Sequence, residues 1–90
     1  MNQEEYLKKL QGTWESMEFD PISTIKIDGD RIERNDGLMS LLIWRDDIKV
    51  WVIPGWTVTI LRLKSDTELE LFIPRNGPTP PESALYNFMK

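Results

Sequence analysis

The sequence predicts a mainly β domain: a small antiparallel up-and-down meander, or partly open barrel, of about seven strands with a short helix at each end. Three observations carry this prediction. Apolar and polar residues alternate along most of the chain, turn residues recur about every 8 to 12 residues, and the chain is 90 residues long. Because that length leaves room for one hydrophobic core, residues 1–90 are expected to form a single domain.

The two helices are predicted from capping signals near the two ends of the chain. Asn2, with a glutamate three positions later, can cap a helix over residues 3–11 that Gly12 would end. Thr79-Pro80-Pro81-Glu82 has the spacing of a capping box with proline at the first helical position, which predicts a helix over residues 80–89. Its apolar side chains would be Ala84, Leu85, Phe88 and Met89.

Turn signals divide the rest of the chain into strands. Asp28-Gly29 has the composition of a two-residue type I′ hairpin, in which both central positions need positive φ, and Pro54-Gly55 suits a type II turn. Other reversals are predicted at Asn35-Asp36-Gly37, at Asp46-Asp47 and at Ser65-Asp66-Thr67. The strands expected between them cover residues 13–20, 22–28, 31–35, 38–45, 48–53, 56–63 and 68–73.

Alternation also predicts which side of each strand is buried. In strand 56–63, Trp56, Val58 and Ile60 share one side, and Thr57, Thr59 and Leu61 share the other. The segment from Leu38 to Trp44 is apolar at both parities, so we expect this strand to be covered on both faces. The C-terminal helix or a second copy of the chain could cover its second face, which makes a homodimer a candidate assembly.

The composition narrows the classes of function. A net charge of −4, from 15 acidic and 11 basic residues, argues against a nucleic-acid partner, because such proteins neutralise phosphates. The chain has no histidine, the commonest general base and metal ligand, and no cysteine, the best nucleophile. It also contains no nucleophile elbow and no glycine-rich phosphate loop. We therefore expect no catalytic residues, no metal site, no cofactor and no enzymatic activity.

The hydropathy pattern bears on localisation. Residues 1–5 are polar and acidic, unlike a secretory signal, and no apolar run approaches the roughly 20 residues that span a bilayer. These features lead us to expect a cytoplasmic protein without a membrane partner.

The segment Leu10-Gln11-Gly12-Thr13-Trp14 resembles the Gly-x-Trp signature that opens lipocalin-like barrels, and in particular small bacterial lipocalin-like domains that begin Leu-x-Gly-Thr-Trp. The avidin group opens with a similar Gly-Thr-Trp. The resemblance implies structural roles for Gly12, where the chain passes close beneath the barrel, and for Trp14, which plugs its end. It also implies an arginine lying across that tryptophan, for which Arg62 and Arg75 are the candidates.

A small ligand is the leading functional hypothesis. Seven short strands leave an interior filled by its own side chains, so a ligand is expected at a shallow mouth, at an open edge or between subunits. The candidate binding residues are the aromatic Trp44, Trp51 and Trp56, with Arg62 or Lys49 as the polar anchor. The alternative is a protein–protein module, such as a small inhibitor or immunity-type protein, that acts through an open sheet edge or the apolar strand.

Overall fold

The computed structural model describes residues 2–16, 18, 23–56, 59–75 and 77–89, with the side chain of Trp56 outside that description. One α-helix, α1 (Gln3–Leu10), precedes the strands, and a short 3₁₀-helix, η1 (Pro54–Trp56), interrupts them. The strands are β1 (Gly12–Ser16), β2 (Ser23–Asp28), β3 (Arg31–Arg34), β4 (Met39–Leu41), β5 (Ile43–Arg45), β6 (Val50–Ile53), β7 (Thr59–Leu63), β8 (Glu68–Ile73) and β9 (Glu82–Phe88).

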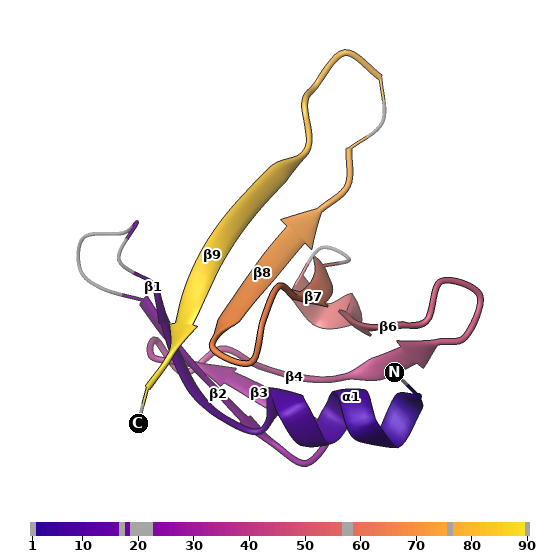
Figure 1. Cartoon of the computed structure of the whole chain (residues 1–90). Coiled ribbons are helices and arrows are strands. Elements are labelled where there is room, and N and C mark those ends of the chain that lie inside the picture. The colour runs from indigo at the N-terminus through magenta and orange to yellow at the C-terminus, as the bar shows by residue number, and fades with distance from the viewer. Residues whose placement is uncertain (1, 17, 19–22, 57–58, 76, 90) are drawn as a thin grey trace.

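The strands form one antiparallel sheet that nearly closes into a barrel (Figure 1). Its order is β4-β3-β2-β1-β9-β8-β7-β6-β5, so that the first and last strands of the chain, β1 and β9, lie side by side in the middle. The two edge strands, β4 and β5, are separated in the chain by Leu42 alone. The chain therefore passes directly from one edge of the sheet to the other, as closure of a barrel requires.

The core lies inside this curved sheet, and α1 covers one end of it. Most strands contribute inward-facing residues to the core, Leu42 does so between β4 and β5, and Tyr6 and Leu10 of α1 join them. In Figure 1 the long β8–β9 hairpin extends away from the side on which α1 lies. The most deeply buried side chains are Leu10, Trp14, Ile25, Ile27, Ile32, Ile53, Leu61 and Leu69.

The N-terminal helix and the antiparallel meander are confirmed. Asn2 caps α1 as predicted, because its Oδ1 accepts a hydrogen bond from the backbone N–H of Glu5 at 2.8 Å. Each predicted turn reverses the chain, but two have other geometries than expected. Asp28 pairs with Arg31, so the hairpin turns at Gly29-Asp30, and positive φ at Gly29 alone indicates a type II′ turn. Pro54 and Gly55 begin η1.

The predicted C-terminal helix is wrong: residues 82–88 form β9. This strand pairs with β8 from Glu82 to Asn87 and with β1 through Phe88 opposite Trp14. Ala84 and Tyr86 thereby face the core. Pairing with β8 along nearly the whole strand, and with β1 at its end, satisfies backbone groups of β9, and this tertiary pairing overrides the local capping signal.

The sheet has nine strands among the described residues, compared with about seven predicted. One addition is β9, and the other arises because segment 38–45 is interrupted at Leu42. Within the single chain, the second face of that segment is not covered by a C-terminal helix as one of the two alternatives expected. Leu42 is buried, whereas Leu38, Met39, Leu41 and Ile43 are 42 to 56% exposed, since the C-terminal helix that could have covered them is a strand.

Candidate ligand-binding site

A cavity of about 360 Å³ opens in the barrel between β3, β7, β8 and β9. It lies at the end of the barrel away from α1: Tyr6 of α1 contacts β7 at Leu61 and Leu63, whereas the cavity begins at Thr59, at the other end of that strand. The lining residues are Arg34, Thr59, Leu71, Ile73, Glu82, Ser83, Ala84 and Tyr86.

The floor of this cavity is apolar because β8 and β9 continue their inward alternation into it. Leu71 and Ile73 follow Leu69 on β8, and Ala84 lies opposite Leu71 on β9. Alanine at this position leaves space that a larger side chain would fill. The floor of the cavity is therefore formed by apolar side chains of the β8–β9 hairpin.

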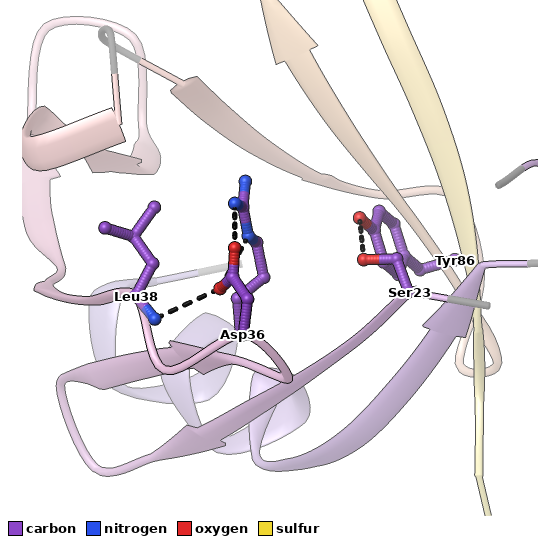
Figure 2. A network of polar contacts seen from close by, with 5 residues as sticks. Ser23, Asp36, Leu38 and Tyr86 are labelled. Atoms are coloured by element: carbon purple, nitrogen blue, oxygen red, sulfur yellow. Dashed lines mark hydrogen bonds and ion pairs between the residues drawn. The ribbon is translucent and has the colours of Figure 1, made fainter. Parts of the chain in front are cut away.

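Arg34 supplies a positive charge to the cavity lining. It follows the inward-facing Ile32 on β3, and its Nε lies 3.2 Å from Asp36 Oδ1 while a terminal nitrogen contacts the other carboxylate oxygen. The backbone N–H of Leu38 also donates to Asp36 (Figure 2). The guanidinium and this N–H hold the pKa of Asp36 at about 2, below its ordinary value. Asp36 thus fixes the position of Arg34.

The opposite side of the cavity carries hydroxyl groups. The Tyr86 hydroxyl lies 3.4 Å from Ser23 Oγ, and Figure 2 shows this pair across from Asp36. Thr59 adds a hydroxyl group from a residue that is nearly fully buried. Glu82, at the rim, pairs with Arg75 at 3.2 Å. The site consequently combines an apolar floor with a guanidinium, hydroxyls and a carboxylate at its edge.

The candidate aromatic residues lie elsewhere, beside α1. Trp44 and Trp51 are paired across β5 and β6 with ring centroids 5.7 Å apart, and Tyr6 packs edge-on against Trp44 at 6.1 Å. Trp51 also donates from Nε1 to the backbone oxygen of Gln3 at 3.4 Å. Through these contacts, the two tryptophans attach α1 to the barrel. The predicted position of Trp56 in the site falls on a side chain outside the described residues.

Lys49 lies in the β5–β6 turn and not at the cavity. Its φ of 56° is in the left-handed region, and its Nζ lies 2.8 Å from Asp46 Oδ1 in an exposed ion pair. Trp44 Nε1 approaches the same carboxylate oxygen at 3.4 Å. The structure thus brings Trp44, Lys49 and Trp51 to one end of the barrel, away from the cavity.

Arg62 faces outward, so it does not lie across Trp14. It shares a side of β7 with Ile60, as predicted, but Thr59 and Leu61 are the residues that face the core. Its guanidinium lies 3.9 Å from the centre of the Phe72 ring and 3.5 Å from Glu70 Oε1. Arg75, the other candidate, pairs with Glu82.

Gly12 and Trp14 take structural positions. Trp14 is fully buried, donates from Nε1 to the backbone oxygen of Leu10 at 2.9 Å, and packs edge-on against Phe88 at 5.1 Å. A Cβ on Gly12, whose φ is +121°, would lie 2.6 Å from Phe88 Cε1. The opening motif therefore joins α1 to β1 directly beneath the last strand.

Neither a protein-family model, nor a curated protein, nor a solved structure matches this chain. Within the described ranges, acidic side chains do not gather in a group of three or more that could hold a metal ion. Among the same residues, every helix is too short or too polar to cross a bilayer. Function is therefore inferred from the geometry of the cavity.

Proposed function

We propose that this protein is a non-catalytic, lipocalin-like binding module that holds a small, mainly apolar ligand in the cavity between β3, β7, β8 and β9. The observation that carries the proposal is the cavity itself, whose volume of about 360 Å³ lies within the range of about 300 to 1,000 Å³ typical of ligand sites. Its apolar floor would hold the body of the ligand, and the groups around it would fix the orientation.

The polar groups suggest how a ligand is held. Tyr86 and Thr59 can each donate or accept a hydrogen bond, and Arg34 can donate to an oxygen atom of the ligand. Because Asp36 holds the guanidinium from one side, binding does not have to order this long side chain first. A compact molecule with one apolar end and one oxygen-bearing end fits this arrangement best.

Two features support the lipocalin-like and non-catalytic parts of the proposal. The Gly12-Thr13-Trp14 motif opens a meander in which β1 pairs with both β2 and the last strand. The absence of histidine and cysteine from the sequence leaves the cavity without the residue types that most often act as general base or nucleophile.

A thermal-shift screen with small amphiphilic and aromatic molecules tests the proposal, because a ligand that prefers the folded state must stabilise it. The informative variant is Ala84→Leu, which fills the cavity from β9. Its matched control is Trp44→Phe, at the other end of the barrel. We expect a stabilising ligand to lose its effect on Ala84→Leu and to keep it on Trp44→Phe.

Two results would contradict this proposal. One is a screen in which no compound raises the melting temperature of the wild-type protein. The other is a ligand whose effect survives Ala84→Leu and disappears in Trp44→Phe, which would place binding at the aromatic end beside α1.

A further inference from the structure

The outer side of β2, β3 and β4 carries an ordered pattern of charges. Here six exposed side chains form two parallel rows, one residue per strand in each row, set by the strand register. The first row is Lys26, Glu33 and Met39, and the second is Asp28, Arg31 and Leu41. We call these six residues the outer β2–β4 face.

The charges of this face are not used within the chain. Lys26 lies opposite Glu33 and Asp28 lies opposite Arg31, yet in the described structure none of the four makes an ion pair within 4.0 Å. Hollows of about 210 and 230 Å³ border Met39, one toward the charged residues and one toward Leu41. The face therefore has free charges, shallow relief and an apolar edge.

The order of the charges makes the face complementary to itself. Consider two copies placed face to face and related by a twofold axis that lies between them, perpendicular to the strands and midway between the two rows. The rotation keeps each strand opposite its own counterpart and exchanges the rows. Lys26 then faces the second copy's Asp28, Glu33 faces the second copy's Arg31, and Met39 faces the second copy's Leu41.

Only one of the two simple twofold arrangements gives this result. An axis parallel to the strands would place Glu33 against the second copy's Glu33 and Arg31 against its Arg31, which are repulsive contacts. The perpendicular axis gives four opposite-charge contacts and two apolar ones. The pattern thus specifies both the occupant and its orientation.

We propose that two copies of this chain associate through the outer β2–β4 face, as a twofold-symmetric dimer with the axis perpendicular to the strands. Met39 and Leu41 are 56 and 55% exposed in the single chain and become the apolar part of the contact. The ligand cavity is on the inner side of the sheet, so this dimer neither needs it nor blocks it. Six side chains make a small interface, and we expect weak, concentration-dependent association.

Two charge reversals test the orientation as well as the association. Arg31→Glu gives a copy with two acids in the central strand, and Glu33→Arg gives a copy with two bases there. Each variant alone would set like charges against each other, whereas an equimolar mixture restores opposite charges at both positions. The control is Glu68→Arg, which reverses an exposed charge on β8, outside the face.

Sedimentation equilibrium up to about 1 mM protein provides the measurement, because it detects dissociation constants in the millimolar range. We expect the wild type and Glu68→Arg to dimerise, each reversal alone to weaken association at least tenfold, and the mixture to recover it. A wild type that stays monomeric to that concentration would overturn the proposal. So would reversals that fold normally and leave association unchanged, or a mixture that does not recover it.

The wild-type protein offers a test that does not depend on variant folding. Exposed opposite charges attract less as salt increases, so the dissociation constant should rise with ionic strength. Dimerisation that strengthens with salt would show that apolar contacts elsewhere hold the copies together, contrary to this proposal.

Discussion

Removing the hydroxyl group of Tyr6 should weaken the attachment of α1 to the barrel and lower the free energy of unfolding. The hydroxyl of Tyr6 donates to the backbone oxygen of Leu61 at 2.7 Å and accepts from the backbone N–H of Leu63 at 3.1 Å. The paired residues of β6 and β7 end at Trp51 opposite Leu61, so no residue of β6 pairs beyond this point. The tyrosine hydroxyl takes the place of the missing strand. Tyr6→Phe removes both hydrogen bonds and leaves two backbone groups without their partner.

The expected loss follows from these two hydrogen bonds. At about 1 kcal/mol each, the substitution lowers the free energy of unfolding by about 2 kcal/mol. For a domain of this length, that corresponds to a melting temperature lower by about 8 to 16 °C. Urea denaturation followed by tryptophan fluorescence and a thermal melt would measure the two quantities.

Tyr86→Phe is the matched control, because Tyr86 is also buried but its hydroxyl makes a single contact of 3.4 Å, to Ser23. We expect it to change the free energy of unfolding by less than about 0.5 kcal/mol, since a long, weak hydrogen bond is lost. If Tyr6→Phe lowers the free energy of unfolding no more than Tyr86→Phe does, the Tyr6 hydroxyl does not replace a strand partner of β7.

The Tyr6 hydroxyl also has a pH signature. Burial raises its pKa above the ordinary value of 10.0, and a hydrogen bond from the Leu63 N–H and the nearby positive charge of Arg62 only partly oppose this. The unfolded chain therefore releases this proton at lower pH than the folded chain does. The stability contributed by Tyr6 is complete below pH 10.0 and is lost as the pH rises from there through the folded pKa.

Three further changes test separate parts of the fold. NMR titration of Asp36 should give a pKa of about 2, and Arg34→Gln should return this pKa toward 3.8. Because the pKa of Asp36 is lowered in the folded state, the stability that Asp36 contributes is lost as the pH falls from 3.8 to about 2. Lys49→Gly should raise the free energy of unfolding by about 0.5 kcal/mol in urea, since glycine accepts the φ of 56° without strain. Gly12→Ala should lower it by at least about 2 kcal/mol, because the added Cβ meets Phe88 at 2.6 Å and φ is +121°.

The sequence was most informative where local chemistry decides the structure. Asn2 caps α1 because its side chain competes well for a free backbone N–H at a helix start, and no distant residue is needed. Gly29 and Gly37 reverse the chain with positive φ, which their lack of a Cβ permits. Ile25 and Ile27 are both buried on one side of β2, because burial of one sheet face imposes a period of two.

The sequence does not indicate the cavity, because the segment that forms its β9 wall has the capping signal of a helix. Ala84 and Tyr86 are two residues apart and face the same side of a strand, but the capping box at Thr79 favoured a period of 3.6. The alternation of Ala84, Tyr86 and Phe88 was the available signal. A short segment of this kind satisfies both periods, and only the pairing with β8 and β1 decides between them.

The exposed apolar segment is a second case in which the sequence pattern alone does not determine the structure. Sequence alone identified Leu38 to Trp44 as apolar at both parities, but not that the chain would be interrupted at Leu42. The interruption follows from closure: residues before Leu42 pair with β3 and residues after it pair with β6. η1 lies against β4 so closely that a Cβ on Gly55 would stand 2.7 Å from Ser40 Oγ. Burial of the inward-facing residues of this segment is therefore explained within one chain. The apolar character of the outward-facing Met39 and Leu41 is what a second copy would have to explain.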